Sequence, residues 1–359
     1  MTDVCNTLTP SQETTPTPSS HQVPVVRLNI KSLEGTKNLG LVLVNGMSQV
    51  VVNTNDWKTG DLAAYVQPDS LVDVTRPEFS FLGRHNRIKT RKFQGTWSQG
   101  LLVPAPPDAQ EGDDVAELLG VKHYNPEDNI SQGCYGSSLG SHRRQSEPVP
   151  HPLSCLSKYD VESLRKYHDQ FTEGEEIILT EKIHGASSRY VWMNDFSDLD
   201  DGVVEGRFYC GTRTRWCFPD GDDPWWKALH ETPLLQEWLK NHPGMIVYAE
   251  LYGNVQSLKY GFTKDERKLA VFDIFDTTTM EFMSHDAARL AAPDLPWVPV
   301  IYRGPYTFAT CDYHSSGVTV IGGGVHLREG IVAKPIIERK TYRHQRVCYK
   351  LVSNEYLAL

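Results

Sequence analysis

A lysine and a glycine three residues apart lie between two apolar runs near the middle of the chain. Lys182 ends the first run, Gly185 lets the backbone turn, and the second run begins at Tyr190. This Lys-x-x-Gly spacing suits an enzyme whose lysine amine attacks the α-phosphorus of a nucleotide triphosphate. The amine is a nucleophile only when it is neutral, so burial or nearby cations must favour loss of its proton. A glycine at the third position leaves room for a nucleotide beside the backbone.

The motif gains weight from strand-like runs downstream, because Lys-x-x-Gly also occurs by chance around solvated surface lysines. Glu250 lies in Glu-Leu-Tyr-Gly, Phe272 in Phe-Asp-Ile, Glu329 and Lys334 in Glu-Gly-Ile-Val-Ala-Lys, and Lys350 in the last run. Taken singly, each run is more simply explained as structure, such as an exposed glutamate or a core phenylalanine. In this order they indicate one site, where two carboxylates bind a divalent metal and two lysines neutralise phosphate charge.

The ordered set resembles the covalent nucleotidyltransferases, which comprise polynucleotide ligases and messenger-RNA capping enzymes. Glu181-Lys182-Ile183-His184-Gly185 is similar to the nucleophile motif of RNA ligases, in which histidine often precedes the glycine. The N-terminal region, with Asn86 to Lys92 and Trp97 to Gly100, resembles the deinococcal-type RNA ligase, which has an N-terminal OB domain. The resemblance covers residues 25–105 and 150–359. The sequence ends nine residues after Lys350, so we expect no C-terminal OB domain like that of DNA ligases.

The resemblance implies an ATP-dependent RNA ligase that forms a lysyl-AMP intermediate and uses Mg²⁺ or Mn²⁺. Its partner would be RNA or an RNA-containing duplex, sealed at 3′-OH/5′-phosphate nicks whose 3′-OH strand is RNA. Lys182 would be the adenylated nucleophile. The resemblance also implies that Thr180 and Glu181 border the adenine and that Phe272 stacks on it. Arg213 would contact the ribose or the donor phosphate, and Lys334 and Lys350 would contact phosphates. Glu250 would bind the ribose or the metal, and Glu329 would orient the metal.

Three positions depart from the family pattern. Ser187 stands where phage-type RNA ligases have asparagine. The last motif usually has two lysines at alternate positions, and here Val352 or Cys348 replaces one of them. Arg215 fits the site arginine nearly as well as Arg213. Two other functions stay open on the sequence alone: a nucleic-acid-binding repair or scaffold protein that keeps a nucleotide pocket without turnover, and an RNA guanylyltransferase.

The N-terminal region predicts a small β-barrel of the OB kind over residues 23–105. Short β-rich runs cover residues 25–30, 39–44, 49–53 and 62–66, and Asn45-Gly46 is a strong hairpin signal. A basic strip without acidic residues follows, and it indicates nucleic-acid binding. Its residues are Arg84, Arg87, Lys89, Arg91 and Lys92. The alternative for this strip is a solvated basic face.

The elements around the candidate site predict an α+β fold of antiparallel sheets with flanking helices. We expect a disordered tail over residues 1–22, a linker over 106–150 with a short helix at 115–119, and a ligase domain over 151–359. Within that domain, helical spacing predicts a helix over 157–171. The segment 174–192 then reads as strand, turn and strand.

Composition places the chain among soluble globular proteins. It has no apolar run of membrane-spanning length and no secretory signal, and its seven cysteines form no C-x-x-C pair. We therefore expect a cytoplasmic monomer, with the nucleus left open and no membrane partner. The net charge of −9 argues against a general cationic coat, so a polyanion site has to be local.

Overall fold

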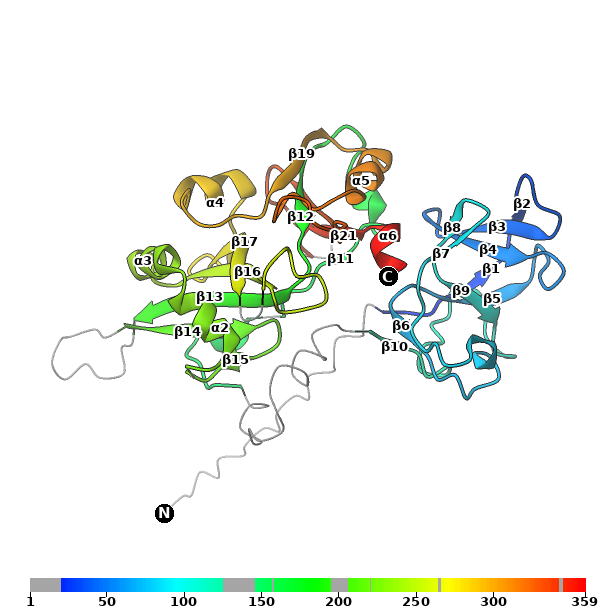
Figure 1. Ribbon diagram of the computed structural model, residues 1–359, viewed down its shortest axis with the longest axis horizontal. Coiled ribbons are helices and arrows are strands. Elements are labelled where there is room, and N and C mark those ends of the chain that lie inside the picture. Colours follow the sequence, from blue (N-terminus) through cyan, green and yellow to red (C-terminus); the bar gives the residue numbers. More distant parts are fainter. Residues whose placement is uncertain are drawn as a thin grey trace, which may run out of the picture.

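The computed structural model describes residues 21–124, 146–156, 158–194, 206–219, 221–263, 266–341 and 345–359. Two β-rich parts are visible in Figure 1, which we call the barrel unit (residues 21–124) and the two-sheet unit (residues 146–359). Within these described ranges, no helix is long and apolar enough to span a bilayer.

The barrel unit consists of short antiparallel strands. One sheet has the order β1-β5-β9 and another β2-β3-β4, with the pairs β6–β10 and β7–β8 beside them. Their bounds are β1 Val25–Arg27, β2 Ile30–Ser32, β3 Leu39–Val44, β4 Ser48–Asn53, β5 Leu62–Val66, β6 Ser70–Leu71, β7 Arg91–Phe93, β8 Thr96–Ser98, β9 Leu101–Pro104 and β10 Lys122–His123. The predicted hairpin joins β3 to β4, where Asn45 (φ 51°) and Gly46 (φ 74°) adopt the left-handed conformations that this turn requires.

The barrel unit continues past the predicted boundary at residue 105. Val115, Leu119 and Val121 are buried in the same core as Val25 and Phe79, and β10 pairs with β6. The predicted helix at 115–119 is a turn instead, because so short a segment, ended by Gly120, cannot repay helix nucleation. Residues 125–145 of the predicted linker lie outside the described residues.

The start of the barrel unit also differs from the predicted tail. Most of that tail, residues 1–20, lies outside the described residues. His21 is described and makes side-chain hydrogen bonds to Ser70 and Gln67, and its ring stacks on His123 with a centroid distance of 4.6 Å. These contacts belong to the barrel unit rather than to a tail.

The two-sheet unit contains two sheets, antiparallel except for one strand pair. The six-stranded sheet has the order β15-β14-β13-β16-β17-β18, and the five-stranded sheet has the order β11-β21-β20-β12-β19. The first sheet's bounds are β13 Ala186–Asn194, β14 Gly206–Thr212, β15 Trp216–Cys217, β16 Met245–Gly253, β17 Arg267–Asp276 and β18 Glu281–Phe282. The second sheet's bounds are β11 Glu162–Ser163, β12 Glu176–Lys182, β19 Val300–Pro305, β20 Gly330–Pro335 and β21 Tyr349–Val352.

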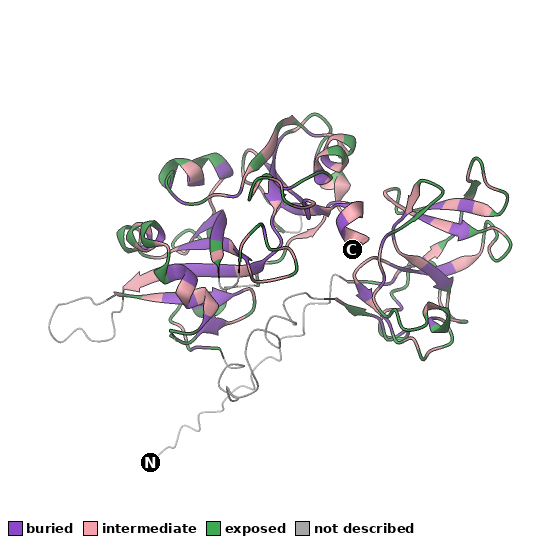
Figure 2. Ribbon diagram, viewed as in Figure 1, coloured by how far each residue is buried: buried purple, intermediate pink, exposed green. Residues whose placement is uncertain are grey.

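Helices pack against both sheets. The helix bounds are α2 Pro224–His230, α3 Pro233–Asn241, α4 His285–Ala291, α5 Phe308–Ser315 and α6 Asn354–Leu357. Leu229 of α2 and Leu235 of α3 pack with Val247 and Val271 in the core of the six-stranded sheet. Cys311 of α5 packs against Leu179 in the core of the five-stranded sheet. The buried residues accordingly concentrate in the strands, as Figure 2 shows. The predicted α+β class is confirmed.

The predicted helix over 157–171 is wrong. Its described residues instead form β11, which pairs in parallel with β21, and a 3-10 turn at His168–Gln170. Leu164 and Phe171 are buried as a helix would bury them, but Leu164 donates its backbone N–H to Lys350 O at 2.8 Å. The apolar spacing is satisfied by a strand followed by a turn, and pairing with β21 overrides the helical preference.

Candidate active site

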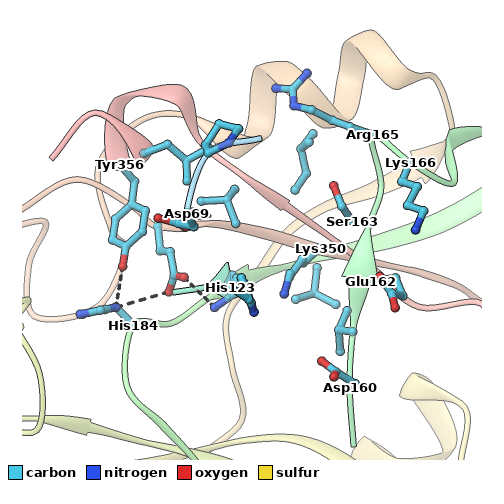
Figure 3. A pocket seen from close by; sticks show the side chains of 18 of the residues that line it. Asp69, His123, Asp160, Glu162, Ser163, Arg165, Lys166, His184, Lys350 and Tyr356 are labelled. Atoms are coloured by element: carbon cyan, nitrogen blue, oxygen red, sulfur yellow. Dashed lines mark hydrogen bonds and ion pairs between the residues drawn. The ribbon is translucent and has the colours of Figure 1, made fainter. Parts of the chain in front are cut away.

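The two sheets meet where the chain passes from β12 to β13, and a cavity of about 430 Å³ lies beside this crossing. Figure 3 shows part of its wall, including Lys350 and Asp160 of the two-sheet unit and Asp69 and His123 of the barrel unit. All nine predicted nucleotide and metal residues line it. They are Thr180, Glu181, Lys182, Arg213, Glu250, Phe272, Glu329, Lys334 and Lys350.

The Lys182 amine lies 2.7 Å from Glu329 Oε1. Sheet register creates this contact, because Lys182 at the end of β12 pairs with Gly330 at the start of β20. The Lys182 side chain is 25% exposed and that of Glu329 is 10% exposed. This ion pair favours the charged ammonium at rest, so any attack by the amine requires its proton to leave. Glu329 Oε2 is buried and, among the described residues, makes no hydrogen bond.

The turn after Lys182 is tightly packed. The His184 N–H donates to the Tyr260 hydroxyl at 2.6 Å, and the Gln256 amide contacts the Gly185 carbonyl. A Cβ on Gly185 would lie 2.3 Å from Leu251 O and 2.9 Å from Glu250 Cγ. Glycine is therefore required here, because the strand that carries Glu250 and Leu251 approaches the backbone closely.

We expect Gly185→Ala to lower the rate at which Lys182 becomes labelled by AMP about tenfold or more. The methyl group has to displace the Leu251 backbone or Glu250, and small shifts of reacting groups are costly. Single-turnover labelling with α-labelled ATP measures the effect. Gly221→Ala is the matched control, because a Cβ there meets nothing within 4 Å. Equal rates for the two variants would contradict this packing argument.

Phe272 and Glu181 also line the cavity. The half-buried Phe272 ring packs against Tyr159 at a centroid distance of 5.2 Å, and the cavity borders it. The Glu181 carboxylate is buried and accepts hydrogen bonds from the Thr319 hydroxyl at 2.5 Å and the Val320 N–H at 3.0 Å. Its side chain therefore secures the adjoining segment of the wall. The Thr180 hydroxyl lies 3.5 Å from Val332 O.

Lys334 already has two partners. Its amine donates to Asp273 Oδ1 at 2.6 Å and to Phe272 O at 2.7 Å. Asp273 also accepts from Arg346 at 2.7 and 2.9 Å and from the Tyr159 hydroxyl at 2.5 Å. Burial alone would raise the pKa of Asp273, but Arg346 and Lys334 hold it below its usual range. Two of the three donors of the Lys334 ammonium are thus used by Asp273 and Phe272.

Lys350 and Arg213 add positive charge to the same cavity. Burial, and then the charge of Lys182, lower the pKa of Lys350. Arg213 lines the cavity and lies 3.7 Å from Asp160, whereas Arg215 is absent from the walls formed by the described residues. Of the two positions where the last motif lacks a lysine, Val352 lines the cavity. Cys348 is 6% exposed and belongs to the interior.

The predicted basic strip does not form one surface. Arg87 is paired with Asp69 at 2.7 Å and lies 4.2 Å from the Tyr124 ring centroid. The Lys89 amine contacts the Leu359 carbonyl. Arg84, Arg91 and Lys92 are exposed, and Lys92 lies over Trp97. Among the described cavity-lining residues, none comes from this strip.

Sequence reasoning missed the residues that support the site. Asp273 directly follows Phe272, and its position on the alternate face of a strand could have marked it as a partner for a buried lysine. Tyr356 and His184 lie 2.9 Å apart beside Glu329. His184 had no role assigned beyond its place in the motif, and nothing in the local sequence indicates Tyr356. Within the described ranges, no group of three His, Cys, Asp or Glu side chains forms a preassembled metal cage.

Comparisons with known proteins agree with this geometry. Residues 175–352 match the RNA ligase family model, and residues 25–105 match an OB-fold domain model. A mutant of Naegleria gruberi RNA ligase with AMP and Mn is similar, with a TM-score of 0.71 and 18% identity over 94% of this chain and 98% of that chain. The structure of the same ligase with PPi has a TM-score of 0.71 and 19% identity over 94% of this chain and 98% of that chain.

A further mutant of that ligase, with ATP and Mn, has a TM-score of 0.70 and 18% identity over 94% of this chain and 98% of that chain. At such identities the likeness shows the fold. No curated protein is similar enough in sequence to count as a match. Residues 175–352 therefore form a domain of the RNA ligase family, with an OB-fold domain in front of it over residues 25–105.

Proposed function

We propose that this protein is an ATP-dependent RNA ligase in which Lys182 becomes bonded to AMP. The observation that carries the proposal is the placement of the Lys182 amine, 2.7 Å from Glu329, in a cavity that Glu250, Phe272 and Lys350 also line. Family membership supports it. The similar Naegleria gruberi ligase structures hold ATP, AMP, PPi and Mn.

In the first step, Lys182 Nζ would bond to the α-phosphorus of ATP as the bond to pyrophosphate breaks. The amine must first lose a proton, and Glu329 is the carboxylate hydrogen-bonded to it. Lys350 and Arg213 bring positive charge to the cavity, which stabilises the departing pyrophosphate. Lys334 would give its remaining donor to a phosphate. Phe272 would stack on the adenine, which Thr180 and Glu181 border.

The donor set fits a divalent metal held largely by phosphates and water. The buried Glu329 Oε2 makes no hydrogen bond in the described part of the chain, and Glu250 lines the same cavity. One or two carboxylates are the protein ligands that Mg²⁺ usually takes beside a nucleotide. Mg²⁺ or Mn²⁺ would supply Lewis-acid neutralisation of phosphate charge. We assign Glu250 and Glu329 to hold it.

In the second step AMP would pass from Lys182 to a 5′-phosphate, and in the third a 3′-hydroxyl would displace AMP and form the phosphodiester. We infer that the substrate is a nicked duplex whose 3′-OH strand is RNA. The barrel unit contributes residues to the cavity wall, and its exposed Arg84, Arg91 and Lys92 suit backbone phosphates. We further propose that the protein acts as a cytoplasmic monomer.

The substrate assignment is tested with nicked duplexes that carry RNA or DNA on each side of the break. We expect sealing to be at least about tenfold faster when the 3′-OH strand is RNA, because a 2′-hydroxyl is a contact that DNA lacks. Equal sealing of all-DNA nicks would refute this specificity. Transfer of label from GTP instead of ATP would identify a guanylyltransferase. No label from either nucleotide would identify a binding protein.

A further inference from the structure

Tyr356 and His184 lie beside the Lys182–Glu329 pair in the wall of the same cavity. The Tyr356 hydroxyl lies 2.9 Å from His184 Nδ1, and His184 Nδ1 lies 3.8 Å from Glu329 Oε2. Glu329 in turn holds the Lys182 amine through its other oxygen. Tyr356, His184 and Glu329 are all buried residues. Figure 3 shows the Tyr356 hydroxyl directed at the His184 ring.

His184 is held firmly on its other side. Its Nε2 lies 3.0 Å from the Ser257 hydroxyl, and its backbone N–H donates to Tyr260. The Tyr356 ring packs against the His184 ring with a centroid distance of 5.5 Å. A ring fixed at both nitrogens keeps one orientation, so it limits the positions open to the neighbouring Glu329 carboxylate.

Tyr356 lies on helix α6, which contacts both units. Ser353, at the start of α6, donates its N–H to the Glu329 carbonyl at 2.9 Å. Toward the barrel unit, Asn354 Oδ1 accepts from Gln99 Nε2 at 2.7 Å, and the Leu357 carbonyl accepts from the Thr90 N–H at 3.0 Å. Figure 1 shows α6 on the side of the two-sheet unit that faces the barrel unit.

We propose that Tyr356 is a positioning residue for lysine adenylation: through His184 it fixes the Glu329 carboxylate against Lys182, and through α6 it makes that arrangement depend on the docked barrel unit. The inference rests on the proposed function, since it assumes that Lys182 is adenylated. Tyr356 borders the same cavity as Lys182, and the hydrogen bond of its hydroxyl goes to His184, so we infer that it acts through His184. Loss of its hydroxyl therefore affects the chemical step and leaves ATP binding intact.

The test is Tyr356→Phe, which removes the hydroxyl and keeps the ring. We expect the single-turnover rate of lysine labelling by α-labelled ATP to fall about tenfold, the equivalent of one buried hydrogen bond. The ATP concentration for half-maximal rate should stay within about twofold of wild type. Sealing of a nick that already carries AMP on its 5′-phosphate should be unchanged, because this substrate bypasses Lys182.

Two further variants make the result decisive. Tyr313→Phe is the matched control, because Tyr313 is 80% exposed and its rate should equal that of wild type. Gln99→Ala keeps the Tyr356 hydroxyl and removes a barrel contact, and it should slow labelling about threefold. A wild-type rate in Tyr356→Phe overturns the inference. So does a lower rate accompanied by weaker ATP binding and a lower melting temperature, which would mark a structural role. If the wild-type protein takes no label, the proposed function itself fails.

Discussion

Lys182→Ala is expected to abolish transfer of AMP from ATP to the protein, a fall of at least about 10⁴-fold. The reason is chemical, because the variant has no amine to bond to the α-phosphorus. The Lys182–Glu329 ion pair is also lost, which leaves the Glu329 carboxylate buried without its cation. Labelling with α-labelled ATP, followed by denaturing electrophoresis, measures the covalent product.

A second substitution separates the nucleophilic role of Lys182 from the effect of its positive charge. Lys182→Arg keeps a cation beside Glu329, but guanidinium stays protonated in proteins and does not attack. It should therefore be as inactive in labelling as Lys182→Ala. Lys268→Ala serves as the control, because Lys268 is exposed on β17 outside the described cavity wall. Any covalent label on Lys182→Ala would assign the nucleophile elsewhere.

The Lys182 variants also test whether the three steps share one nucleophile. Both variants should still seal a nick whose 5′-phosphate already carries AMP, because sealing of that substrate does not require AMP transfer from Lys182. Loss of this activity together with labelling would show that the substitutions damage the whole cavity. A melting temperature close to wild type would then identify local rearrangement of Glu329 as the cause.

Asp273→Asn is expected to lower the free energy of unfolding by about 3–5 kcal/mol, because it removes one partner from a buried ionic cluster. Asp273 is 3% exposed in its side chain and pairs with both Lys334 and Arg346. Without its charge, both cations remain in the interior with less compensation. Chemical denaturation at pH 7 measures the change. Asp294→Asn, at an exposed position, is the control.

The same cluster predicts a dependence on pH. The pKa of Asp273 is lowered in the folded protein, so its stabilisation is complete at neutral pH. It is lost as pH falls below the ordinary aspartate value of about 3.9 toward the folded-state pKa. The stability gap between wild type and Asp273→Asn should therefore narrow below about pH 4. A difference in unfolding free energy that stays constant with pH would show that the charge of Asp273 does not contribute to stability.

Local sequence patterns predicted the parts of this protein whose geometry is itself local. Asn45-Gly46 specifies a tight turn through its own backbone preferences, and the flanking strands formed as expected. Lys182 and Glu329 were predicted to share a site from the order of their motifs. Short-range patterns failed over 157–171, where apolar spacing suggested a helix. The competing partner is β21, a strand far along the chain in which Lys350 pairs with Ser163.

The sequence by itself determined the strand character, the alternation of faces and the order of the charged motifs, because these depend on residues close together in the chain. Only the tertiary structure decided which charges meet. Sheet register placed Glu329 beside Lys182, and the meeting of the two sheets brought Asp273 of β17 to Lys334 of β20. It also brought Tyr356 of α6 to His184, 172 positions away. Such contacts depend on how distant strands order and align, and no short stretch of sequence carries that information.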